Sequence, residues 1–387
     1  MDKRLDHALS KLVEEIDRVE TTRKKFGAVM KKIKGHIDLS RFPALVPDTM
    51  ETSLLKKLEP TSLSGLRIAG IDGGLVRKRF RSMDILLTRA VAVVFQFGRE
   101  DGPDVEFYPE AFPEPRITPV LLALPGPELD QLASLERVAI ELEATISVLD
   151  EFHTDLILVD GSLFYHPRDR PQRGSTAFAK FQEVMALYRQ LYHKSRKKKT
   201  TLVGIVKDSR STRMVQVLGE LLPHIIRDSS VFELMQDVDY RWLLKVSRDC
   251  GILDTFMEPG ERTFAFRYSS ELTHNVNSAS DELAIWSSSI WVTYLKTAQD
   301  DLPLRIEVLM DQYSKDTKEL DRALSAILPL SWQHPEYGIP TPILEADARA
   351  RITGHEAQLI IDRLMALSGL TYTVLEKRRS RNPFGGG

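Results

Sequence analysis

Two aspartates of this 387-residue chain each follow a short apolar run and come directly before a glycine. The first is Asp72 in LRIAGIDGG, and the second is Asp160 in DLILVDGSL. Each run has the length and composition of a buried β-strand, so each carboxylate is expected at the C-terminal end of a strand. If the two strands are neighbours in one sheet, the two carboxylates lie side by side.

Two carboxylates a few ångströms apart repel each other and share a proton unless a cation lies between them. Hard divalent cations bind carboxylate oxygens, and two such ions about 3.5–4 Å apart suit the in-line hydrolysis of a phosphodiester. The glycines after each aspartate are expected to let a phosphate backbone or a metal-bound water approach closely. The alternative is structural, because Asp-Gly is also a common turn pair at the end of a strand.

The elements that must position these acids lie between residues 66 and 209. Three strands joined by short Gly-, Asp- and Pro-containing breaks come first, and a Pro-rich loop follows them. A long helix over about 128–150 has one apolar face and leads into the strand that ends at Asp160. A helix at 176–195 and a buried strand at 200–209 complete a βββ-α-β-α-β order, which predicts a mixed sheet with helices on its faces.

The segments on either side are less regular. Residues 1–58 are predicted to be helical, because apolar residues recur at steps of three and four. They are Leu5, Leu9, Leu12, Ile16 and Val19. This stripe fits either a helix packed on its own domain or a helix that meets a partner. Later strands are predicted at 262–270, 290–297 and 302–310, and helices at 318–329 and 345–369. The expected domains are a helical segment (1–58), a large α/β domain (59–370) and a basic, disordered tail (371–387).

Composition and charge restrict the class of protein. The chain is 42% hydrophobic and 28% charged, as in globular proteins, and its net charge of -2 excludes a uniformly basic nucleic-acid binder but no local basic patch. The single cysteine, Cys250, excludes an internal disulfide framework and a Cys-rich zinc site. No apolar run approaches the roughly 18 residues that a membrane span needs, and the N-terminus is unlike a signal peptide. We therefore expect a soluble cytoplasmic protein without a membrane partner.

The βββ-α-β order, with acids on the first strand, the helix and the fourth strand, is the arrangement of the ribonuclease H-like fold. Four segments in order resemble the NurA nuclease family over about residues 66–365: GIDGG, ILVDGSL, VGIVKDSRS and PTPILEADARARIT. The resemblance implies a DNA nuclease that uses two Mn²⁺ or Mg²⁺ ions to cut single strands and resect duplex ends. It also implies a homodimer that works in DNA repair with a HerA-type hexameric translocase.

The resemblance also implies roles for particular residues. Asp72 and Asp160 match the first two metal-binding acids of the family. The family's glutamate lies on the long helix, a little under twenty residues before the second aspartate, where this chain has Glu141 and Glu143. Both flank the apolar stripe, so periodicity does not choose between them, and the spacing slightly favours Glu143. The alternative is that both are ordinary surface acids.

The C-terminal motif departs from the family pattern. An active-site tyrosine and histidine of the family match Ile339 and Asp347 here. Asp347 is expected to act as a fourth carboxylate, which would favour Mg²⁺ or Mn²⁺, and the alternative is a helix N-cap. Lys207 in VGIVKDSRS is similar to an active-site lysine that contacts the scissile phosphate, although Asp208 beside it could equally be its ion-pair partner.

Basic residues next to the first acid are expected to contact DNA phosphates and to make binding depend on salt. They are Arg77, Lys78, Arg79 and Arg81. The run over 194–199 is expected to be a solvated turn before a strand.

Two other function classes stay open. A catalytically silent adaptor would keep this fold to bind DNA or a translocase, and the departures at Ile339 and Asp347 support it. GIDGG also resembles the first phosphate loop of actin-like and sugar-kinase ATPases, but no convincing second phosphate loop follows. Because the chain has no Walker A motif, ATP hydrolysis by that motif would have to come from a partner.

Overall fold

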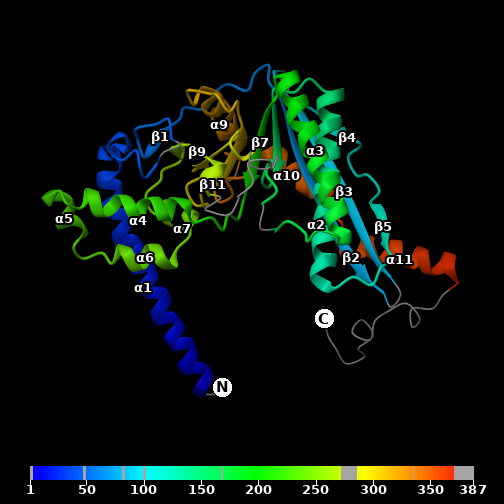
Figure 1. Cartoon of the computed structure of the whole chain (residues 1–387), viewed down its shortest axis with the longest axis horizontal. Helices are drawn as coiled ribbons and strands as arrows, with labels where there is room; N and C mark the ends of the chain where they lie inside the picture. Colours follow the sequence, from blue (N-terminus) through cyan, green and yellow to red (C-terminus); the bar gives the residue numbers. More distant parts are fainter. Residues whose placement is uncertain are drawn as a thin grey trace. The chain divides into compact units, whose positions relative to one another are not determined.

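The structure is a computed structural model that describes residues 3–46, 49–80, 83–98, 102–166, 169–271, 286–333 and 335–369 (Figure 1). The chain forms two compact units. Unit 1 contains residues 1–62 and 204–340, and unit 2 contains residues 63–203 and those from 341 onward. None of the helices in the described ranges combines the length and the apolarity that a membrane crossing requires.

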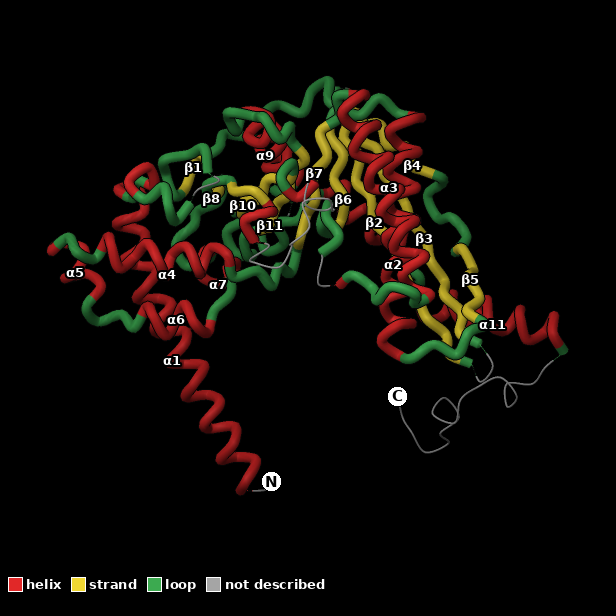
Figure 2. Tube along the Cα trace, viewed as in Figure 1, coloured by secondary structure: helices red, strands yellow, loops and turns green. Residues whose placement is uncertain are grey.

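Unit 2 is built on a mixed β-sheet with the strand order β7-β6-β2-β3-β4 (Figure 2). β2 pairs antiparallel with β3 and parallel with β6, and β3 pairs antiparallel with both β4 and β5. This arrangement confirms the expected ribonuclease H-like α/β fold. The strands are β2 (Arg67–Arg79), β3 (Asp84–Gln96), β4 (Asp104–Tyr108), β5 (Arg116–Val120), β6 (Leu156–Asp160) and β7 (Thr201–Val206), whose second half is assigned to unit 1.

Helices cover both faces of the sheet of unit 2. On one face lie α2 (Gly126–Glu151) and α3 (Thr176–Lys198), and on the other lie α10 (Thr341–Ala350) and α11 (Gly354–Ser368) (Figure 1). Ala346 and Ala350 of α10 pack against buried valines of β3. Ile361 and Met365 of α11 pack farther along the same hairpin, against Phe80 and its neighbours. The sheet is therefore buried between two helical layers.

Unit 1 contains an antiparallel sheet with the strand order β1-β8-β10-β11, and β9 also pairs with β10. The strands are β1 (Leu55–Lys57), β8 (Glu261–Thr263), β9 (Phe266–Arg267), β10 (Ile290–Leu295) and β11 (Leu304–Leu309). The helices are α1 (Lys3–Ile33), α4 (Arg213–Ile225), α5 (Ser229–Met235), α6 (Tyr240–Val246), α7 (Asp249–Leu253) and α9 (Lys318–Leu330), with short 3₁₀ turns η1 (Lys34–His36), η2 (Leu39–Arg41) and η4 (Tyr268–Glu271).

The two halves of α1 differ in burial. Phe26 and Met30 in the second half are buried in unit 1. In the first half, Leu5, Leu12 and Ile16 are each about half exposed, at 50%, 56% and 51%. The predicted stripe lies in the exposed first half, so the packing of α1 on unit 1 comes from other residues, in the second half.

Several expected elements differ from those of the structure. The helix predicted to residue 58 ends at Ile33, because Gly35 and Pro43 interrupt the helical run that follows. The expected Pro-rich loop contains β5, which tolerates Pro119 because it borders the sheet. The helix predicted at 345–369 is two helices, since Thr353 caps the start of α11 by accepting from Glu356 N (3.1 Å).

Helices α4 to α7 fill residues 213–253, where no element was predicted. The predicted domain boundaries at residues 58 and 370 stay predictions, and the predicted tail lies outside the described residues.

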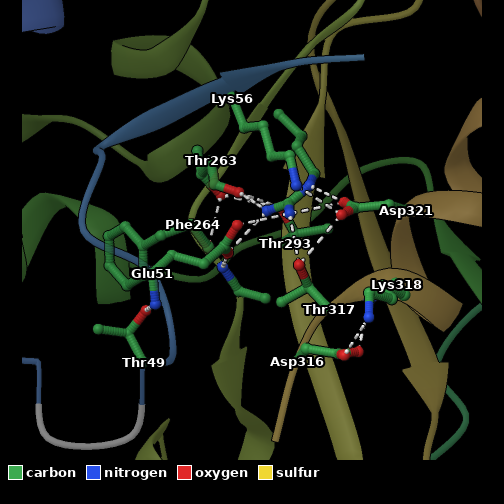
Figure 3. A network of polar contacts seen from close by, with 12 residues as sticks. Thr49, Glu51, Lys56, Thr263, Phe264, Thr293, Asp316, Thr317, Lys318 and Asp321 are labelled. Carbon is green, nitrogen blue, oxygen red and sulfur yellow. Dashed lines mark hydrogen bonds and ion pairs between the residues drawn. The ribbon is translucent and has the colours of Figure 1, made fainter. Parts of the chain in front are cut away.

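A buried polar network holds the chain before β1 against the rest of unit 1 (Figure 3). Arg262 on β8 is 0% exposed and donates from Nη1 and Nη2 to the two oxygens of Glu51 at 2.8 and 2.6 Å. Its Nε donates to Asp321 Oδ1 at 2.7 Å, and Lys56 Nζ contacts the other oxygen of Asp321 at 2.7 Å. Burial alone would lower the pKa of Arg262, but Glu51 and Asp321 outweigh burial and raise it. The network thus ties β8, α9 and the segment before β1 together.

We predict that Arg262→Met lowers the free energy of unfolding by about 3–5 kcal/mol, because it leaves two acids of a buried network without their partner. Urea unfolding followed by circular dichroism measures this change. Lys318→Ala is the control, because its ion pair with Asp316 (3.1 Å, Figure 3) has side chains 88% and 58% exposed and should leave stability unchanged. Equal effects of the two substitutions would contradict the prediction.

Candidate metal centre

Asp72 and Asp160 come from two parallel neighbouring strands. Ile71 of β2 pairs with Val159 of β6, so the residues that follow lie side by side, as the sequence predicted. β6 ends at Asp160, and Gly161 turns the chain away with φ +106°. β2, however, continues to Arg79, so the expectation that Asp72 ends its strand is wrong.

Asp347 joins these two acids from α10 on one face of the sheet. One carboxylate oxygen from each of Asp72, Asp160 and Asp347 lies within 4.8 Å of the others. Asp72 is buried, Asp160 is half-buried and Asp347 is exposed, so the cluster runs from the core to the surface. Asp347 lies inside α10, three residues before its last residue, and therefore is not a helix N-cap.

Two glycines of β2 allow α10 to approach the strand backbone directly. A Cβ added at Gly70 would lie 2.1 Å from the carbonyl oxygen of Pro342, and one at Gly74 would lie 2.0 Å from that of Ala350. Because side chains alternate along a strand, Gly70, Asp72 and Gly74 face the same side. Asp72 is therefore the one side chain that β2 presents between these two contact points, beside the turn of α10 that carries Asp347.

Glu141 of α2 approaches the cluster from the opposite face. A Cβ added at Gly73 would lie 2.4 Å from Glu141 Oε1, so this glycine makes room for the glutamate. Gly73 and Gly74 were expected to leave space for a phosphate or a metal-bound water. The structure corrects this interpretation, because Glu141 and the backbone of α10 occupy the space on the two sides of β2.

Burial governs the electrostatics of Glu141. The residue is 6% exposed, and burial raises the pKa of its carboxyl to about 8. Arg137, whose Nη1 donates to Glu141 Oε1 at 2.9 Å, opposes this shift, while the negative charges of Asp72 and Asp160 add to it. Without a cation, the carboxyl therefore holds a proton at neutral pH.

Glu143, which the spacing favoured, lies elsewhere on α2. Its Oε2 accepts from Arg116 Nη2 at 2.7 Å, and its side chain is 37% exposed. It borders a separate cavity of about 200 Å³ beside Tyr108 and Pro109. The geometry therefore brings Glu141, and not Glu143, to the aspartates.

The acidic cluster opens into a cavity of about 370 Å³ within unit 2, which Asp72 and Asp347 line. Arg351, an exposed cation directly after α10, also lines this cavity and was not among the predicted site residues. Arg89 of β3 is buried, and its Nη1 donates to the carbonyl oxygens of Arg349 (3.4 Å) and Arg351 (3.5 Å). Arg89 thus holds the C-terminal end of α10, where a positive charge interacts favourably with the negative end of the helix dipole.

Two of the basic residues predicted to contact DNA are paired with an acid of α2. Arg77 forms an ion pair with Asp130 of α2, and Arg79 contacts the same carboxylate at 3.3 Å. Lys78 is half-buried, and Arg81 lies outside the described residues. Lys207 follows β7 in unit 1, where it lines a cavity with Arg210 and Arg248. Its contact with a scissile phosphate stays a prediction.

We predict that Gly74→Ala displaces α10 and lowers the free energy of unfolding by about 1–3 kcal/mol, because the added Cβ overlaps the backbone of Ala350. Urea unfolding measures the loss. Gly126→Ala is the matched control, because a Cβ at that position of α2 meets nothing within 4 Å. A Gly74→Ala protein as stable as the control would contradict the close approach of α10.

The raised pKa of Glu141 predicts a pH-dependent stability in EDTA. Folded Glu141 keeps its proton up to about pH 8, whereas in the unfolded chain the carboxyl ionises near its ordinary pKa of 4.5. Rising pH between these values therefore favours unfolding. Glu141→Gln should become more stable relative to the wild type as pH increases from 5 to 8, as urea unfolding can measure.

Glu143→Gln, at a half-buried position of the same helix, serves as the control for this experiment, since its stability relative to the wild type should change less over the same range. A difference between Glu141→Gln and the wild type that is independent of pH would contradict the assigned pKa.

Comparisons with known proteins identify the family of this chain. No curated protein matches the sequence significantly. Among solved structures, the NurA nuclease from Sulfolobus solfataricus is similar at 14% identity, with a TM-score of 0.57 over 96% of this chain and 99% of that one. A NurA bound to dAMP and manganese is similar at 12% identity (TM-score 0.47, 96% and 98% covered). The family model described as NurA domain matches residues 66–352, and the chain therefore belongs to the NurA family.

Proposed function

We propose that this protein is a metal-dependent DNA nuclease that hydrolyses phosphodiester bonds in single strands and at duplex ends. The observation that carries this proposal is the clustering of carboxylate oxygens from Asp72, Asp160 and Asp347 within 4.8 Å. The three acids come from two strands and a helix that meet inside a ribonuclease H-like unit. Membership of the NurA family and the fold shared with a NurA nuclease support the same activity.

The residues of the cluster fit divalent cations. Like charges at this separation repel each other, and the buried Glu141 beside them has a raised pKa for that reason as well as for its burial. Oxygen-only ligand sets of this kind suit Mg²⁺ and Mn²⁺. We propose that Asp72, Asp160, Asp347 and Glu141 hold two such ions. When bound, the ions would supply Lewis-acid activation of water and charge stabilisation at the phosphate.

The side chains around the cluster prepare it for an anionic strand. Asp160 and Asp347 face solvent in part, and a Cβ at Gly161 would meet nothing within 4 Å, so a phosphodiester can reach the acids from this side. Arg351 lines the same cavity, where its guanidinium can donate to a phosphate oxygen. Buried Asp72 is oriented by Gly73 N, which donates to its Oδ1 at 2.6 Å.

The same geometry weighs against a catalytically silent adaptor. Carboxylates that remain charged beside a DNA backbone repel its phosphates, so a surface evolved only to hold DNA gains nothing from three converging acids. The proposal has further parts that rest on the resemblance to the family. They are a homodimer that acts with a HerA-type translocase, a contact of Lys207 with the scissile phosphate, and a cytoplasmic role in resecting DNA ends.

Replacing single acids tests the proposal. Asp72→Asn and Glu141→Gln should each lower Mn²⁺-dependent cleavage of a 5′-labelled single strand by at least about a hundredfold, since losing even an outer partner of a metal site costs about 10- to 100-fold. EDTA should abolish cleavage by the wild type. Gel assays over time with Mn²⁺ or Mg²⁺ measure both effects.

Glu143→Gln, two residues along the same helix, is the matched control and should keep wild-type activity. An Asp72→Asn protein that cuts DNA as fast as the wild type would refute the site, and a Glu143→Gln protein that is as inactive as Glu141→Gln would refute the choice of glutamate.

A further inference from the structure

A second charged cavity lies wholly within unit 1 and collects cations from three separate parts of the chain. It measures about 410 Å³ and is lined by Arg23 of α1, by Lys207 and Arg210 after β7, and by Arg248 before α7. Asp208 is the one acid among the residues that line it. We call it the arginine cavity. Sequence patterns do not indicate this cavity, because its arginines lie far apart along the chain.

Local contacts fix the walls of the arginine cavity. Arg248 Nη1 donates to the carbonyl oxygen of Arg210 at 2.9 Å, which joins the loop after β7 to the start of α7. Arg23 Nη1 contacts Glu20 at 2.8 Å, while its Nη2 lies over Gly251, 3.4 Å from where a Cβ would stand. The guanidinium of Arg23 is thus held at the cavity wall and keeps about a third of its side chain (30%) exposed.

The basic runs that stand out in the sequence are partly neutralised by acids on other elements. Arg77 and Arg79 share Asp130, and Lys194 pairs with Asp150. In the arginine cavity, Arg23 is paired with Glu20, and Lys207, Arg210 and Arg248 line the same space with Asp208. Converging like charges repel one another, and a bound anion relieves that repulsion. The cavity is therefore suited to an anionic ligand.

Two exposed apolar side chains help to identify the anion. Val246 and Leu302 line the arginine cavity and are 50% and 45% exposed. A small inorganic anion gains nothing from apolar neighbours, whereas a nucleic-acid strand offers sugar and base surface next to each phosphate. Arginine recognises phosphate through paired N–H donors, and cationic grooves of this kind follow the backbone of single strands.

We propose that the arginine cavity binds the phosphodiester backbone of single-stranded DNA, with Arg23 and Arg210 as phosphate contacts. This inference rests on the proposed nuclease function and extends it, because it assigns a strand-binding site to residues of unit 1. Binding here depends on charge and not on base sequence. It therefore adds affinity that decreases as salt increases.

Fluorescence anisotropy of the full-length protein with a labelled 20-nucleotide oligo(dT) tests the inference, in EDTA so that no strand is cut. The dissociation constant is measured from 50 to 200 mM KCl for the wild type, Arg23→Ala, Arg210→Ala and Arg210→Lys. Each alanine variant should bind more weakly and lower the slope of log affinity against log salt by about 0.7, the value for one phosphate contact on a single strand. Arg210→Lys should retain most of the slope.

Lys318→Ala removes one exposed positive charge from α9 in the same unit and is the control, so it should leave the slope unchanged. Melting temperatures close to the wild-type value establish that the arginine variants are folded. Alanine variants with wild-type slopes, or a wild type that does not bind the strand, would overturn the inference. So would complete displacement of the strand by millimolar inorganic phosphate at constant ionic strength, which would show a site for a free anion.

The two proposals fail in different ways. If Mn²⁺-dependent cleavage is present but the arginine variants bind like the wild type, the nuclease function stands and this site is wrong. If the arginines set the salt slope but no cleavage occurs with any divalent ion, the strand-binding site stands and the catalytic proposal is wrong.

Discussion

The close contact between α10 and β2 is the constraint on which the acidic cluster depends. Gly70 and Gly74 remove every side chain that would separate the two backbones, and Asp72 stands between them. A strand that carried alanine at either position would push the helix, and Asp347 with it, away from the sheet. Glycine loses more conformational entropy on folding than other residues do, but here it allows an acid from a helix to lie beside two acids from strands.

Electrostatic repulsion within the cluster works against the same packing. Burial and the charges of the neighbouring aspartates raise the pKa of Glu141, so the metal-free protein stores unfavourable energy at neutral pH. A bound cation relieves this repulsion and favours the ionised carboxyl. The proposed ion binding would therefore be coupled to the docking of α2 and α10 on the sheet, because the same carboxylates would take part in both.

The fold of unit 2 could largely be predicted because its strands are short apolar runs and its helices have clear apolar faces. The approach of Asp72 to Asp160 was expected on the condition that their strands are neighbours, and β2 and β6 do pair. The choice between Glu141 and Glu143 could not be made from sequence, since both flank the apolar face of α2. Glu141 reaches the aspartates because Gly73 has no side chain to block it. Asp130 contacts Arg79 from 51 residues away along the chain. Arg23, Arg210 and Arg248 come to one cavity only in the folded chain.

The order in which the acids occur along the chain has a consequence for biosynthesis. Asp72, Glu141 and Asp160 are all made before residue 204, but Asp347 follows the long passage of the chain through unit 1. A nascent chain on the ribosome, or a fragment cut before Thr341, contains the sheet without α10. A chain that ends before Thr341 therefore lacks Asp347, and the proposed set of metal ligands is incomplete in it.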